Sequence, residues 1–332
     1  MRHVYLSSRT SVFMDSKLTV LYETHLKPQL EALDQDRKKV IKQYWLSLLL
    51  GVGFAAIIIP LSFMYNFQAF GIIFSIIIAI VMHRLYSKRW DQYKKDYKHK
   101  IVTKLISSID SSFSYKPTQC IDKLDYKNSA LFGRHYDRYR GEDFIEGQID
   151  KTSLRFSELH TEYKTQGRDN NGKSQDQWHT IFKGLFFVAD ANKHFSGQTT
   201  IMPKNHSIFS AMGQKLSDIF SNNQQQVILE DPEFTQLFNV YSNDQVEARY
   251  LLSPAMVQRL INFSNRSDHT IAFSFVNDHL YIAISSSKNY FEPKLFQQAD
   301  SLTFIASIYY DLKFVINIVD ELDLNTRIWT KP

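Results

Sequence analysis

The strongest constraint on this chain is a run of forty residues, 43–82, that contains no Asp, Glu, Lys or Arg. The run is apolar except for Tyr65-Asn66-Phe67-Gln68 near its middle. At about 1.5 Å of rise per helical residue, the first half spans roughly 30 Å, the thickness of a bilayer core. The second half, from about Phe67 to Met82, is short for a full span. The sequence predicts a transmembrane helical hairpin over residues 45–83.

Basic residues stand on both sides of this run, whereas its central turn carries no charge. They are Arg37, Lys38, Lys39 and Lys42 before the first helix, and Arg84, Lys88 and Arg89 after the second. By the positive-inside rule, both termini are expected in the cytoplasm. The rival interpretation is a hairpin buried inside a soluble protein. Two helices that are apolar all round are hard to bury in a chain of 332 residues.

The net charge of +5 is local. Residues 84–104 carry eight Lys and Arg against two Asp, whereas residues 105–332 carry 23 Lys and Arg against 27 Asp and Glu. A nucleic-acid-binding protein would carry the excess on its folded domain, so we expect no nucleic-acid partner. The basic stretch either contacts anionic lipid head groups or only sets the topology. The candidate membrane-surface residues are Arg84, Lys88, Arg89, Lys94 and Lys95.

Helices are predicted on both sides of the hairpin, after a disordered N-terminus over residues 1–15, where Met14 is an alternative start. Residues 16–44 show apolar residues at helical spacing, with a possible bend at Pro28. Residues 84–117 form a basic juxtamembrane helix followed by a Ser-rich linker. We favour an antiparallel helical stalk, with a helix on the membrane surface as the alternative.

Residues 118–325 predict a soluble α+β domain with a mostly antiparallel sheet and flanking helices. Strands are expected at residues 144–150, 154–164, 179–189, 198–202 and 226–229, and 271–276 with 280–285 should form a hairpin. Helices are expected at 207–220 and 301–322, and after caps at Asp231, Ser242 and Ser253. The charged segment 137–143 is interpreted as a polar loop or, alternatively, as a docking surface.

Three segments resemble a known family when taken together. They are Gly184–Asp190, Leu229–Phe234 and Tyr241–Pro254, of which the last is the most specific. With the hairpin upstream, the chain resembles a bacterial membrane family catalogued as domain of unknown function 3137. The resemblance implies a bacterial inner-membrane protein without an established activity, and a possible LemA-like membrane protein as partner. The family defines no catalytic residues.

Carboxylates gather between residues 230 and 250. Paired carboxylates can serve acid–base chemistry or hold a divalent metal. We favour the structural interpretation, in which Asp231 caps a helix and Glu247 faces solvent or pairs with Arg249. Asp231, Asp244, Glu247 and Arg249 are therefore interpreted only as possible interaction residues.

Signatures of catalysis or cofactor binding are not legible in this sequence. His179, His194 and His206 fit no metal-ligand spacing, and Cys120 is the single cysteine, so neither a disulfide nor a multi-cysteine zinc site is possible. Nucleophile-elbow, phosphate-loop and dinucleotide motifs are missing. We therefore predict no cofactor. The favoured hypothesis is a membrane-anchored, cytoplasm-facing, non-catalytic scaffold or partner. The alternative is an enzyme or small-ligand sensor with its site in the 230–250 region.

Overall fold

The computed structural model of the chain describes residues 16–168, 174–191, 194–204, 224–267, 269–299, 301–322 and 324. The chain divides into two compact units. The helical unit comprises residues 1–108 and 291–311, and the sheet unit comprises residues 109–290 and 312–332. Residues 291–311, which the sequence analysis placed in the C-terminal domain, thus group with the helices. The predictions for residues 1–15 and 207–220 lie outside the described residues.

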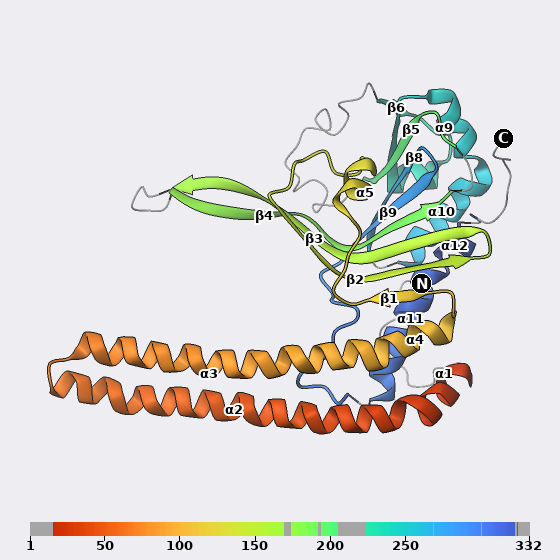
Figure 1. Ribbon diagram of the computed structural model, residues 1–332. Helices are drawn as coiled ribbons and strands as arrows, with labels where there is room; N and C mark the ends of the chain where they lie inside the picture. Colours follow the sequence, from red (N-terminus) through yellow and green to blue (C-terminus); the bar gives the residue numbers. More distant parts are fainter. Residues whose placement is uncertain are drawn as a thin grey trace. The chain divides into compact units, whose positions relative to one another are not determined.

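Two long helices lie side by side in the helical unit (Figure 1). The first consists of α1 (Ser16–Leu21), a π-helical turn (Tyr22–Leu26) and α2 (Lys27–Met64). The second consists of α3 (Gln68–Tyr97), another π-helical turn (Lys98–Val102) and α4 (Thr103–Ile109). The predicted amphipathic and basic helices are therefore continuous with the two apolar helices. The first π-helical turn ends just before Pro28, which lies in the first turn of α2, where a proline is tolerated because its missing backbone donor is not needed there.

Apolar residues at helical spacing are buried on both sides of the hairpin. They comprise Leu18, Leu26, Leu30 and Leu33 before it, and Tyr93, Tyr97, Ile101 and Leu105 after it. Because α2 contacts both α3 and the π-helical turn that follows α3, this arrangement agrees with the predicted antiparallel stalk.

A nine-stranded antiparallel sheet forms the centre of the sheet unit, counted over the described residues, and confirms the predicted α+β class. Its spatial order is β1-β2-β3-β4-β9-β8-β5-β7-β6. The strands are β1 (Ser114–Lys116), β2 (Arg138–Ile149), β3 (Thr152–Arg168), β4 (Ser174–Asp190), β5 (Gln198–Pro203), β6 (Gln225–Val227), β7 (Phe238–Ser242), β8 (Thr270–Val276) and β9 (His279–Ser285).

The described helices of the sheet unit are α5 (Lys123–Asn128), α8 (Pro232–Leu237), α9 (Gln245–Leu251), α10 (Pro254–Arg266) and α12 (Ile318–Glu321). The helix α11 (Leu302–Ile316) begins in the helical unit and ends in the sheet unit. The caps predicted at Asp231 and Ser253 are confirmed. The cap predicted at Ser242 is wrong, because Ser242 is the last residue of β7 and Asp244 caps α9 instead.

Two further predictions are corrected by the sheet. The interpretation of residues 137–143 as a polar loop is wrong, because residues from Arg138 onward form the first half of β2 and pair with β3. The linker assigned to residues 107–117 contains β1, whose Tyr115 pairs with Ile145. Both errors have one cause. β1 is the outermost strand, and residues 138–142 of β2 pair with β3 alone, so both segments lie at the edge of the sheet, where little hydrophobic alternation is needed.

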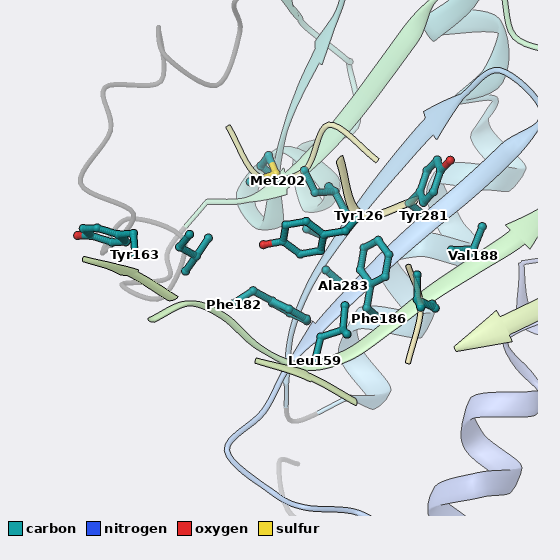
Figure 2. Packing of buried hydrophobic residues seen from close by; sticks show 13 residues of the cluster. Tyr126, Leu159, Tyr163, Phe182, Phe186, Val188, Met202, Tyr281 and Ala283 are labelled. Atoms are coloured by element: carbon teal, nitrogen blue, oxygen red, sulfur yellow. The ribbon is translucent and has the colours of Figure 1, made fainter. Parts of the chain in front are cut away.

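The sheet buries both of its faces. On one face, Phe263 of α10 contacts Phe273 of β8, and the rings of Phe156 and Phe187 stack. On the other face, Tyr126 of α5 packs against Phe186 of β4 within a cluster of buried residues (Figure 2). This arrangement explains why the central strand β4 is apolar on both sides, as predicted.

Candidate functional site

The long helical hairpin carries an unusual number of exposed apolar side chains. Between Trp45 and Leu85, twenty-one large hydrophobic residues are exposed on α2, α3 and the turn between them, among them Leu49, Ile57, Phe70 and Ile77. A soluble monomer rarely exposes apolar surface on this scale, so the surface requires a covering partner or a membrane.

Three helices of the described part are long and apolar enough to cross a membrane: Ser16–Met64, Ala69–Ile109 and Leu302–Asp320. They differ in what covers their most apolar stretch. Of that stretch, 0% and 11% is buried in the first two helices, but 47% in the third. About half of the apolar stretch of the third helix is therefore covered by the protein itself, whereas those of the first two helices are almost wholly uncovered.

Close packing holds the two hairpin helices together. Gly71 of α3 contacts Ser62 of α2 so closely that an added Cβ would overlap the serine side chain. Ser62 and Ser75 are both buried, and each donates its hydroxyl to a carbonyl of its own helix. Small residues and internally satisfied hydroxyls at such a contact are typical of helix pairs in a bilayer.

Aromatic and basic side chains meet at the open end of the hairpin. The rings of Tyr44 and Tyr86 lie edge to face, with centroids 5.3 Å apart, and Arg89 donates to the side-chain oxygen of Gln43. These contacts fix which residues of the two helices lie at the same level. Of the predicted membrane-surface residues, Arg84, Lys88, Arg89 and Lys95 are exposed, whereas Lys94 lies 3.4 Å from Asp91 and 3.5 Å from Glu292.

A buried ion pair occupies the place where Arg37 interrupts the apolar stripe of α2. Arg37 and Asp34 are only 6% and 5% exposed, and Nε of Arg37 lies 2.7 Å from Oδ1 of Asp34. Arg37 also donates to the carbonyl of Leu295, and Asp34 accepts from the backbone of Ala299. The pair thus fastens residues 295–299 to α2 within the helical unit.

The pKa of Asp34 reflects two opposing influences. Burial by itself would raise this pKa. Hydrogen bonds from Arg37, Lys38 and the Ala299 backbone, together with the charge of Arg37, outweigh burial and hold the pKa below its ordinary value. Asp34 is therefore ionised in the folded protein at neutral pH.

The carboxylates among the possible interaction residues of the 230–250 region accept hydrogen bonds from nearby backbone N–H groups. Asp231 accepts from the Phe234 backbone, and Asp244 accepts from the Val246 and Glu247 backbones. Glu247 accepts from the backbones of Ser196 and Gly197 with both carboxylate oxygens.

Arg249 does not contribute an ion pair to this group. It is exposed and donates to the carbonyl and side-chain oxygens of Gln245. A cavity of about 380 Å³ between β6, β7 and α8 lies in the same region, and Asp231, Asp244 and Glu247 do not line it. The sequence interpretation of these carboxylates as structural is consistent with this geometry.

The histidines considered as metal ligands lie apart. His179 contacts the hydroxyl of Thr165, and His194 lies 2.6 Å from Asp278, while His206 is outside the described residues. Among the residues that the structure describes, no group of three or more His, Cys, Asp or Glu side chains is placed to hold a metal ion.

A charged cavity on β2, β3 and β4 was missed by the sequence analysis. Its volume is about 330 Å³ and its charged lining residues are Arg140, Glu142, Glu158, His160, Lys183 and Lys288. Its floor includes Gly184, which has a φ of +149° and whose Cβ would overlap the carbonyl oxygen of Ile284. Only glycine fits this backbone, so the close approach of β4 to β9 at the cavity depends on it.

The sequence contained a partial signal for this cavity. Arg138, Arg140 and Glu142 alternate at the spacing that places side chains on one face of a strand. The residues that complete the cavity come from β3 and β4, and their proximity depends on the strand register, which local patterns do not define.

Comparison with known proteins identifies a family for the C-terminal part of the chain. Residues 180–324 match the family model "Protein of unknown function (DUF3137)". The resemblance drawn from the sequence is thereby confirmed for these residues. No curated protein matches the chain. Among solved structures, the crystal structure of the mycobacterial trehalose monomycolate transport factor A, TtfA, aligns with 71% of this chain and 96% of its own, at 11% identity and a TM-score of 0.38. That similarity is too low to carry an argument.

Proposed function

We propose that this DUF3137-containing protein is a membrane-anchored, non-catalytic module that holds its sheet unit at the cytoplasmic face of a bacterial inner membrane. The observation that carries the proposal is the uncharged hairpin with large apolar side chains exposed on both of its helices. Placing this surface in hydrocarbon removes it from water and leaves the backbone hydrogen bonds satisfied within each helix.

The length of the two hairpin helices supports a hairpin that crosses the whole bilayer. From Tyr44 to Tyr65 the helix rises roughly 32 Å, and from Phe67 to Tyr86 roughly 29 Å, both close to the thickness of a bilayer core. The Tyr44–Tyr86 contact would then lie at the membrane surface, where aromatic rings gather, beside Arg89. The basic residues at this end, and their absence from the turn, favour cytoplasmic termini.

A role in binding another membrane protein is the second part of the proposal. The carboxylates that suggested chemistry are engaged in caps and backbone contacts, so their geometry favours a structural role. A stable anchor with a large attached unit suits a scaffold or a binding partner of another membrane protein. That other protein is LemA-like or of a different kind. The alternative of an enzyme with its site in the 230–250 region gains no support from that geometry.

Crosslinking in native membranes, followed by mass spectrometry, tests the partner. We expect crosslinks from the exposed lysines next to the hairpin, such as Lys88 and Lys95, to a second membrane protein. The same reaction after detergent solubilisation and dilution is the control, because accidental lateral neighbours separate there while a bound partner stays. Recovery of this protein alone in both samples would contradict a heteromeric role.

A further inference from the structure

Three basic side chains form a row across the charged cavity of the sheet unit. Arg140 of β2 is the register partner of His160 on β3, and His160 is the register partner of Lys183 on β4. Directly opposite residues point to the same face, and neighbouring strands lie about 4.8 Å apart. Three groups that carry or accept positive charge therefore stand side by side, an arrangement that destabilises a sheet unless negative charge lies close by.

Carboxylates lie near this row but do not pair directly with its arginine and lysine. Among the described residues, no carboxylate forms an ion pair with Arg140 or Lys183. His160 lies 3.9 Å from Glu162 and bonds the Thr180 hydroxyl. Burial lowers the pKa of His160, the carboxylate of Glu162 opposes this, and the charges of Lys183 and Arg140 lower the pKa further.

A second row of opposite sign lies next to the first. Glu142 of β2 is the register partner of Glu158 on β3, two residues along each strand from Arg140 and His160. Glu158 accepts a hydrogen bond of 2.7 Å from the Tyr290 backbone through one of its carboxylate oxygens. The rows are separated by about 7 Å, the length of two extended residues. Lys288 also lines the cavity, and Glu142, Glu158 and Lys288 all have partners within the protein. The row of Arg140, His160 and Lys183 is therefore the place for an anion.

We propose that this cavity binds a small phosphate ester, with the phosphate on Arg140, His160 and Lys183. A guanidinium fork and an ammonium group match the several acceptor oxygens of a phosphate. A volume of about 330 Å³ is at the lower end of the range for small-molecule pockets, so the ligand is a head-group-sized molecule. The proposal does not depend on the membrane anchor, because every residue of the cavity belongs to the sheet unit.

Binding of O-phosphoethanolamine to the full-length protein in phosphatidylcholine nanodiscs tests this site. We expect saturable binding that is at least about tenfold weaker in the double variant Arg140→Gln/Lys183→Gln, which loses two charge-assisted contacts. The matched control is Lys123→Gln/Lys127→Gln, which removes two positive charges from exposed positions on α5 and should bind like the wild type. Inorganic phosphate should compete for the same site, because it offers the same kind of acceptor oxygens to Arg140, His160 and Lys183.

A competition experiment distinguishes a lipid head group from a soluble phosphate ester as the natural ligand. Displacement of O-phosphoethanolamine by soluble dihexanoyl phosphatidylethanolamine would indicate a lipid head group as the natural ligand. Failure of the lipid to compete would indicate a soluble phosphate ester. If neither O-phosphoethanolamine nor inorganic phosphate binds the wild type, or if both double variants lose binding equally, the site does not exist as proposed.

Loss of binding through misfolding is separated from loss of contacts by two measurements. Removing like charges from the row should leave the melting temperature of Arg140→Gln/Lys183→Gln unchanged or raise it at low salt. If this variant melts at a lower temperature than the wild type, the test moves to the wild-type protein, whose His160 pKa is measured by NMR with and without ligand. The His160 signal is assigned as the one that disappears in His160→Gln. A bound phosphate should raise the pKa of His160, and an unchanged pKa at saturating ligand would overturn the proposal.

Discussion

Replacing Ile57 and Ile77 together by Asp is expected to release the protein from membranes. Both side chains lie near the middle of the hairpin helices and are 61% and 51% exposed. A carboxylate at the centre of a membrane helix costs about 2.5–3.5 kcal/mol, so the two substitutions together cost roughly 5–7 kcal/mol of insertion free energy. The share of protein that stays in the membrane pellet after an alkaline carbonate wash measures the effect.

The matched control applies the same chemical change outside the hairpin. Leu124 on α5 and Val246 on α9 are 65% and 80% exposed, so Leu124→Asp/Val246→Asp introduces two carboxylates at equally open apolar positions. This variant should stay in the pellet like the wild type. Equal retention of the two Asp variants would mean that Ile57 and Ile77 face water, and the hairpin would not be an anchor.

Removing Arg37 should destabilise the helical unit more than removing any exposed charge. In Arg37→Ala, the carboxylate of Asp34 stays buried and loses its closest cation, and residues 295–299 lose the bond to the Leu295 carbonyl. Breaking a buried pair in this way costs about 3–5 kcal/mol, with the lower end favoured here because Lys38 still reaches Asp34 at 2.9 Å. Urea unfolding in a nonionic detergent measures the loss.

Two further variants separate the buried pair from general charge effects. Lys39→Ala removes a cation from an exposed pair with Asp36 and should cost less than about 1 kcal/mol. Asp34→Leu/Arg37→Met replaces the whole buried pair by apolar side chains and should recover most of the lost stability. An Arg37→Ala protein as stable as Lys39→Ala would show that the pair does not hold residues 295–299 in place.

The pH dependence of stability follows from the same pair. Because the pKa of Asp34 is lower in the folded protein than in the unfolded chain, its contribution is fully present above about pH 4. The contribution is lost as the pH falls through the pKa of the folded state. The difference in stability between the wild type and Asp34→Leu/Arg37→Met should therefore stay constant from pH 5 to 7 and change only in more acidic solution.

The sequence was most informative where one signal was strong and local. The apolar run, the Asn277-Asp278 hairpin between β8 and β9, and the caps at Asp231 and Ser253 were all predicted from short segments. Each depends on a turn, a cap or a hydrophobic stretch that needs no distant partner. The family resemblance also rested on such a segment, and the family model confirms it for residues 180–324.

Features that depend on residues far apart in the chain were missed. The Asp34–Arg37 pair is buried partly because residues 295–299 return to α2. From the sequence, Arg37 was interpreted as one of the basic residues before the hairpin. The cavity requires Arg140, His160 and Lys183 to meet in one register across three strands. A bulge between Glu142 and Ile145 shifts that register, and a local pattern does not report where a bulge falls.

Thiol labelling of intact cells gives the most direct test of a hairpin that crosses the membrane with its turn outside. In a Cys120→Ser background, the single substitutions Asn66→Cys at the turn and Lys127→Cys on α5 report the two sides. A membrane-impermeant maleimide should label Asn66→Cys in intact cells, and Lys127→Cys only after the membrane is opened. Labelling of Lys127→Cys in intact cells, or protection of Asn66→Cys until lysis, would contradict the proposed topology.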